Sequence, residues 1–168
     1  MKIAYTMTRG RGELDRLLAD FAETLGARGV RTCGIVQINT DCGSGHRCDM
    51  DVQVLPDGPR IRISQYLGKE SKGCRLDPAS LETSVAEVGR RMEEDFDIFI
   101  LNKFGKQEAE GRGFRHLIGD ALARGASVLV GTNPLNAEKF EDFTDGAATS
   151  IAPDLDALLH WYESPEEA

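Results

Sequence analysis

A chain of 168 residues is the size of one globular domain, and its 40% hydrophobic and 29% charged residues are an ordinary balance for a protein with one core. The net charge of −8 argues against general binding to DNA or RNA, although it leaves room for a local basic pocket. The longest apolar run, at residues 96–101, is too short to cross a bilayer, and the first residues lack the apolar stretch of a signal peptide. We therefore expect a cytoplasmic protein without membrane insertion.

The hydrophobic periodicity predicts strands that alternate with helices. Leu14, Leu17, Leu18, Phe21, Ala22 and Leu25 form one apolar stripe at helical spacing, and Gly29 is a suitable stop. In chain order we expect a strand at 3–7, a glycine-rich loop at 8–12, a helix from 14 to about 28, a strand at 30–39, an antiparallel hairpin at 49–64, a helix from 78 to about 94, a strand at 96–101, a helix around 114–122, a strand at 127–131, a short strand at 150–152 and a helix at 154–163.

This alternation is typical of an α/β fold with a mostly parallel, doubly wound sheet, into which the hairpin is inserted. We expect the strand at residue 3 to lie beside the strand at residue 96, and the hairpin to lie at one side. Residues 1–163 then form a single domain, and 164–168 form an acidic tail. Ligands of such sheets bind outside the carboxyl ends of the strands, so the loops after residues 7, 101 and 131 should line that edge.

The loop after the first strand has the parts of a phosphate cradle. A strand, a glycine-rich loop and a helix N-terminus direct backbone N–H groups and the helix dipole at an anion. The loop reads Thr8-Arg9-Gly10-Arg11-Gly12-Glu13-Leu14-Asp15, so it has neither the lysine nor the Ser/Thr of a Walker A loop. A plain polar turn and an anion cradle with Arg9 and Arg11 as guanidinium forks both fit this pattern.

The cysteines give a second candidate site. Cys42, His46, Cys48 and Cys74 offer three thiolates and one imidazole, a ligand set that suits Zn²⁺. The spacing between Cys42 and Cys48 is not that of a zinc knuckle, so unpaired thiols and a redox pair of Cys48 with Cys74 remain open. Cys33 lies in an apolar strand and is expected to be a small core residue.

Residues 96–132, FDIFILNKFGKQEAEGRGFRHLIGDALARGASVLVGT, resemble the central part of the thermophile-type nucleoside-triphosphatase family. In that family an apolar strand ends in Asp-Glu-x-Gly-Lys-x-Glu, and a helix and a buried strand follow. The matching positions here are Gly105, Lys106, Glu108, Phe114 and Ala121-Leu122. Asn102-Lys103 stands where the family has Asp-Glu. The resemblance implies a P-loop fold, and the departures imply loss of the acidic residues that hold Mg²⁺ and position water.

Nearly the whole chain is also similar to an uncharacterised bacterial family that is often encoded beside molybdate-transport genes. The similar segments are CDMDVQVL, RIRISQ, GCRLDP, NKFGKQEAEGRG and DLDALLHWY. This resemblance implies a link to molybdenum metabolism, with molybdate-transport or molybdenum-cofactor proteins as partners.

Three hypotheses follow for the function. The first is a non-catalytic P-loop-like protein that binds an oxoanion, such as molybdate, or a nucleotide. Its site would consist of Thr8, Arg9, Gly10, Arg11, Gly12, Asn102, Lys103 and Lys106. The second is a divergent nucleoside-triphosphatase or another nucleotide-dependent enzyme. The third is a regulatory partner of a transporter without a small ligand.

Overall fold

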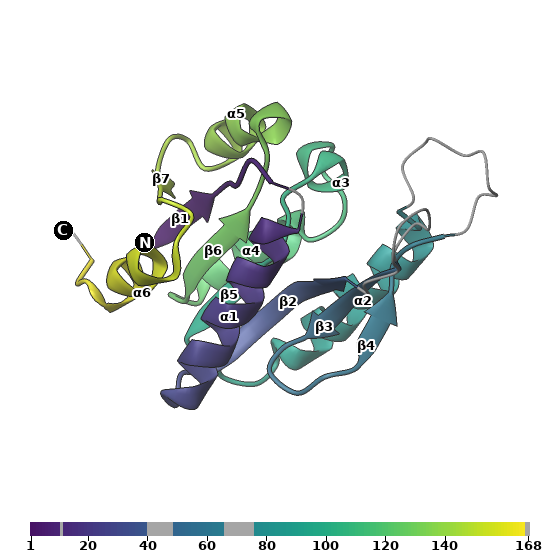
Figure 1. Cartoon of the computed structure of the whole chain (residues 1–168), viewed down its shortest axis with the longest axis horizontal. Coiled ribbons are helices and arrows are strands. Elements are labelled where there is room, and N and C mark those ends of the chain that lie inside the picture. The colour runs from purple at the N-terminus through teal and green to yellow at the C-terminus, as the bar shows by residue number, and fades with distance from the viewer. Residues whose placement is uncertain (11, 40–48, 66–75, 167–168) are drawn as a thin grey trace.

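The computed structural model describes residues 1–10, 12–39, 49–65 and 76–166. Within these residues the chain forms one seven-stranded sheet and six helices (Figure 1). The strands are β1 (Ile3–Thr6), β2 (Thr32–Asn39), β3 (Met50–Val54), β4 (Arg60–Arg62), β5 (Ile98–Leu101), β6 (Ser127–Gly131) and β7 (Thr149–Ser150). The helices are α1 (Glu13–Ala27), α2 (Pro78–Arg91), α3 (Lys106–Ala109), α4 (Arg115–Ala123), α5 (Pro134–Phe143) and α6 (Leu155–Glu163).

The strand order is β4-β3-β2-β5-β6-β1-β7. Neighbouring strands in the part of the sheet ordered β2-β5-β6-β1-β7 are parallel. β3 pairs antiparallel with β2 and with β4. The predicted α/β class, the mostly parallel sheet and the hairpin at one side are therefore confirmed. Within the described residues, no helix has both the length and the apolar composition needed to span a membrane.

One detail of the predicted topology is wrong. β1 does not lie beside β5, because β6 pairs with both of them and separates them. The apolar runs at 98–101 and 127–131 are both covered on two faces, so burial alone does not tell which of them is the neighbour of β1. The register of β1 with β6, which sets Ile3 opposite Val128, settles the order.

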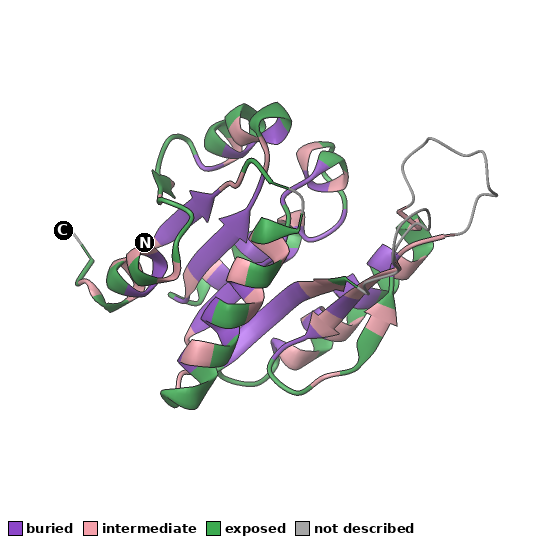
Figure 2. Ribbon diagram, in the orientation of Figure 1, coloured by how far each residue is buried: buried purple, intermediate pink, exposed green. Residues whose placement is uncertain are grey.

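Helices cover both faces of the sheet (Figures 1 and 2). Side chains of β5 alternate between the two resulting cores, with Ile98 and Ile100 in the one that contains α1 and α6. Phe99 and Leu101 belong to the other core, which contains residues of α2, α4 and α5. All four are at most 1% exposed, as expected for a central strand of a doubly wound sheet.

Helix α5 was not among the helices that periodicity predicted. Its start carries a strong local signal, since Asn133 caps the helix by accepting a hydrogen bond from the N–H of Asn136 at 3.1 Å, and Pro134 occupies the first turn. The Asp77-Pro78 pair marks the start of α2 in the same way. Phe140 of α5 packs on Tyr5 of β1 and thereby fixes α5 near the carboxyl end of the sheet.

Candidate functional site

The loop between β1 and α1 leads directly into a helix whose N-cap is a glycine. Gly12 stands at the N-cap position with φ of 74°, a left-handed conformation that glycine adopts without strain. No side chain of the described residues accepts a hydrogen bond from the first turn of α1. Its free N–H groups and the helix dipole therefore give this turn a partial positive charge.

The flanking loop residues are open to solvent. Arg9 and Gly10 are exposed, and the Thr8 hydroxyl donates to the carbonyl of Gly10 at 3.3 Å. Arg11 lies outside the described residues. The predicted strand, loop and helix are thus present in the described part of the chain, whereas the predicted role of these residues in anion binding stays a prediction.

Two carboxylates in the first turn of α1 take different directions. A Cβ atom placed on Gly10 would lie 2.3 Å from Glu13 Oε1, so the Glu13 carboxylate rests against the loop. The Asp15 carboxylate instead accepts hydrogen bonds from Asn102 Nδ2 at 2.8 Å and from Asn39 Nδ2 at 2.6 Å. An anion that enters the loop has to displace Glu13, while Asp15 is already bound to the strand ends.

A chain of amides joins α1 to the carboxyl ends of β2 and β5. Asn102, which is 3% exposed, accepts from the backbone N–H of Gln37 at 2.8 Å. Gln37 Nε2 donates to Asn39 Oδ1, also at 2.8 Å. Because a carboxylate at Asp15 only accepts, these bonds fix which end of each amide is oxygen and which is nitrogen. The network holds the start of α1 against the two strands.

Close backbone contact around Asn102 depends on Gly131. A Cβ atom at Gly131 would lie 2.3 Å from the Asn102 carbonyl oxygen and 2.9 Å from Leu14 Cδ2. The last residue of β6 therefore has to be glycine for α1 and β5 to approach so closely. Thr132 links this position to the end of β1 and to the segment after β5. Its N–H donates to the backbone carbonyl of Thr6, and its hydroxyl donates to the backbone carbonyl of Phe104.

The two lysines after β5 differ in their surroundings. Lys103 is exposed and has no hydrogen bond or ion pair with any residue that the structure describes. Lys106 is 4.0 Å from Glu110, which also pairs with Arg112. The charge of Lys103 is therefore not balanced by any described residue, whereas the charges of Lys106 and Arg112 are partly balanced.

Glu108 is buried close to these lysines in the chain, and its carboxylate binds backbone N–H groups. It is 3% exposed and accepts from the backbone N–H groups of Gly105 at 3.0 Å and Phe114 at 3.3 Å. Burial raises the pKa of this carboxyl group, and the two N–H donors oppose that change. Glu108 thereby fixes the short helix α3 against the start of α4, and with it the direction of the segment at 103–106.

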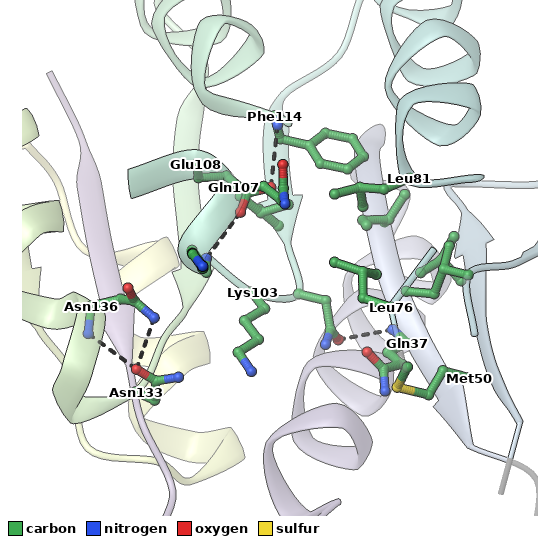
Figure 3. Close-up of a pocket in the computed structure, with 17 residues that line it drawn as sticks. Gln37, Met50, Leu76, Leu81, Lys103, Gln107, Glu108, Phe114, Asn133 and Asn136 are labelled. Atoms are coloured by element: carbon green, nitrogen blue, oxygen red, sulfur yellow. Dashed lines mark hydrogen bonds between the residues drawn. The ribbon is translucent and has the colours of Figure 1, made fainter. Parts of the chain in front are cut away.

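A cavity of about 350 Å³ lies beside this edge, on the face of the sheet that carries α2 (Figure 3). Its apolar lining consists of Ile35, Met50, Val52, Ile63, Leu76, Leu81, Leu101 and Phe114. Polar side chains of Gln37, Asn102, Lys103, Lys106, Gln107, Glu108, Asn133 and Asn136 complete the lining. In Figure 3, Lys103 lies between Asn133 on one side and Gln37 on the other.

The residues of the predicted metal site, Cys42, His46, Cys48 and Cys74, all lie outside the described residues. Among the residues that are described, no three His, Cys, Asp or Glu side chains gather as a metal site would require. Cys33 is a free, buried thiol, as expected, and burial raises its pKa to about 11.

The amides Gln37, Asn39 and Asn133 were not among the predicted site residues. A signal for the two asparagines was present, because Asn39, Asn102 and Asn133 all come at or just after the end of an apolar parallel strand. The carboxyl ends of parallel strands meet at one edge of the sheet, so polar residues at these positions are expected to converge.

The fold is of the P-loop nucleoside-triphosphatase type. Two solved structures share it over nearly the full length of both chains. A human cancer-related nucleoside triphosphatase superposes with a TM-score of 0.68 at 19% identity, covering 99% of this chain and 100% of its own. THEP1 from the hyperthermophile Aquifex aeolicus superposes with a TM-score of 0.61 at 17% identity, covering 98% and 100%. At these identities the likeness shows the fold alone.

The chain belongs to the family described as "Protein of unknown function (DUF2478)", whose model matches residues 3–161. A curated relative, "Molybdenum import ATP-binding protein ModC 2" from Bradyrhizobium diazoefficiens, is 37% identical over 161 residues. The alignment covers 96% of this chain but 18% of the relative. The chain thus spans less than a fifth of the length of that protein.

Proposed function

We propose that this chain is a non-catalytic P-loop-like protein that binds an oxoanion or a nucleotide at the edge formed by residues 8–13 and 102–106. The observation that carries the proposal is a helix N-terminus without a side-chain cap, at the same edge of the sheet as a lysine that is unpaired among the described residues. The Asn102 side chain is bonded to Asp15 in the first turn of α1, and Lys103 is the next residue. Free N–H groups, a helix dipole and a lysine are the usual partners of phosphate-like anions.

The residues at the edge argue against hydrolysis. When Gly12 is set at the last glycine of a Walker A loop, Glu13 stands in place of the lysine and Leu14 in place of the magnesium-binding Ser/Thr. Asn102 and Lys103 stand where a carboxylate pair would hold Mg²⁺ and orient water. Removing these charges removes most of the electrostatic stabilisation of a phosphoryl-transfer transition state. Binding without turnover is the function that remains.

The link to molybdenum metabolism rests on the relative named for molybdenum import and ATP binding. That relative is named for ATP binding and molybdenum import, so the candidate ligands for this chain are a nucleotide and molybdate, and both carry oxygens of the kind that backbone N–H groups and arginines bind. The alignment covers only 18% of that relative, and this favours a further function. A domain that occurs as part of a much longer protein named for import can serve as a regulatory partner of a transporter, with no small ligand of its own.

Calorimetry with molybdate, sulfate, phosphate and ATP tests the proposal. We expect saturable binding of at least one of them, and we expect Arg9→Ala with Arg11→Ala to weaken it roughly tenfold or more, as for loss of a charge-assisted bond. The matched control is Arg60→Ala with Arg90→Ala, two arginines on β4 and α2 that lie away from the loop. If no anion binds, or if the loop variant binds like the control, the proposed site is wrong and the regulatory function takes its place.

A further inference from the structure

The cavity beside Lys103 is a pocket that is partly open to solvent, and it is large for a gap between packed elements of one fold. Close packing leaves few gaps larger than one water molecule. A volume of about 350 Å³ corresponds to roughly ten water molecules at liquid density. It also falls at the lower end of the range for small-molecule sites, which is roughly 300–1,000 Å³.

The walls of the cavity are apolar and come from separate elements. Val52 of β3, Leu81 of α2 and Leu101 of β5 are each at most 7% exposed and line it together with Phe114. Such walls offer water few hydrogen-bond partners, so an apolar group is the better occupant. These walls therefore favour an uncharged, hydrophobic group over water.

The polar groups with unused capacity lie around Lys103. Gln37 Nε2 is held by Asn39, which leaves Gln37 Oε1 as a free acceptor among the described residues. Asn133 Oδ1 accepts from Asn136, which leaves Asn133 Nδ2 as a free donor within the same part of the chain. The Lys103 side chain lies between these two amides (Figure 3). The Lys103 ammonium group and the Asn133 Nδ2 donor together favour an anionic group next to Lys103.

We infer that the cavity binds an organic anion, with an uncharged, ring-sized body against the apolar walls and a phosphate-type head at Lys103. This inference rests on the proposed function and deepens it, because the head would lie at the same edge as the loop at 8–13. It narrows the ligand to an organic phosphate, since a bare inorganic oxoanion leaves the apolar cavity unused.

Three probes separate the two parts of such a ligand. 1-Naphthyl phosphate has both parts, 1-naphthol has the ring alone, and inorganic phosphate has the head alone. We expect naphthyl phosphate to bind at least about tenfold more tightly than either fragment, because it alone gains both apolar burial and the lysine contact. Equal affinity for naphthyl phosphate and inorganic phosphate would overturn the inference.

Two variants place the ligand in the cavity. Lys103→Met should weaken naphthyl phosphate about tenfold, and Lys139→Met, at an exposed lysine of α5 outside the lining, should not. Leu81→Phe puts a larger side chain into the cavity and so reduces its volume; it should weaken binding of naphthyl phosphate and leave binding of inorganic phosphate unchanged. Unchanged binding in Lys103→Met would overturn the inference whether or not Leu81→Phe folds.

The outcomes also separate this inference from the proposed function. If Arg9→Ala with Arg11→Ala loses inorganic phosphate but keeps naphthyl phosphate, the loop and the cavity are both binding sites. If wild-type protein binds naphthyl phosphate alone, and Lys103→Met abolishes that binding, the cavity is supported as a binding site and the loop is not. If ATP binds through the loop while naphthyl phosphate binds no better than phosphate, the proposed function stands and the cavity inference fails.

Discussion

Exchanging Asn102 and Asp15 tests the network that joins α1 to the strand ends. Asn102→Asp alone replaces the donor that Asp15 accepts from at 2.8 Å with a second carboxylate, at a position that is 3% exposed. A lost hydrogen bond to a charged group costs about 1.5–3 kcal/mol. Two charges about 4 Å apart at an effective dielectric constant of about 20 repel by about 4 kcal/mol. The two carboxylates can take up one proton, which limits the sum of these two costs. We therefore expect Asn102→Asp to lower the free energy of unfolding by about 2–4 kcal/mol at neutral pH.

The double variant Asp15→Asn with Asn102→Asp should recover most of that loss. The new carboxylate at position 102 would accept from the Gln37 N–H and from the new amide at position 15. The oxygen of that amide would accept from Asn39, so every donor keeps an acceptor. Urea unfolding at pH 7 and pH 4 gives the free energies for a double-mutant cycle. The single variant should regain stability at pH 4, where the carboxylate pair holds a proton. A double variant no more stable than Asn102→Asp would refute this account of the network.

Three further predictions concern buried positions. Burial raises the pKa of Glu108 in the folded chain, so the stability that this group contributes is present below its unfolded pKa and is lost as the pH rises through its folded pKa. Glu108→Gln should therefore lose less stability relative to wild type at pH 7 than at pH 4. Glu108→Ala should lose more stability than Glu108→Gln at both pH values. Because the pKa of Cys33 is about 11 and the thiol is buried, mass spectrometry should find it unlabelled by iodoacetamide at pH 8 until urea unfolds the chain. Gly131→Ala should cost about 1–3 kcal/mol by overpacking against Asn102 and Leu14, measured by urea unfolding.

Controls and contradicting results are specific to each position. An unchanged difference between Glu108→Gln and wild type from pH 4 to pH 7 would mean that the Glu108 carboxyl group does not titrate as its burial implies. Labelling of Cys33 in folded protein at the rate seen in urea would contradict its burial. Gly119→Ala is the control for Gly131→Ala, since a Cβ atom there meets nothing within 4 Å, and equal stability of the two variants would contradict the close contact.

The sequence was sufficient to predict the elements whose signals are local. Alternation of Met50, Val52 and Val54 with polar residues predicted an edge hairpin, and the continuous run before Asn102 predicted a central strand. Helices α3 and α5 were not predicted, because α3 has only four residues and α5 is weakly amphipathic. The order of β1, β6 and β5 was not predictable from burial, because these strands are equally apolar on both faces.

The candidate site was predictable only in outline. The strand, loop and helix at 3–27 and the polar exit at Asn102 and Lys103 follow from local pattern. The bonds of Asp15 to Asn39 and Asn102 depend on the parallel register of β2 with β5, which sets Ile35 opposite Leu101. The cavity depends on the packing of α2 against the hairpin. Both are tertiary features that residue spacing does not encode.

We propose that this P-loop-type fold binds an anion at the start of α1 without cleaving a nucleotide. The most direct measurement is NMR of ¹⁵N-labelled protein titrated with ATP and Mg²⁺, with ³¹P spectra of the same sample followed over time. We expect saturable shifts of the backbone amides of Gly12, Glu13 and Leu14, and we expect the ATP signals to decrease no faster than in a protein-free sample. Amides of these three residues that stay unshifted with ATP and also with molybdate, sulfate and phosphate, or steady conversion of ATP to ADP and phosphate by the protein, would contradict the proposal.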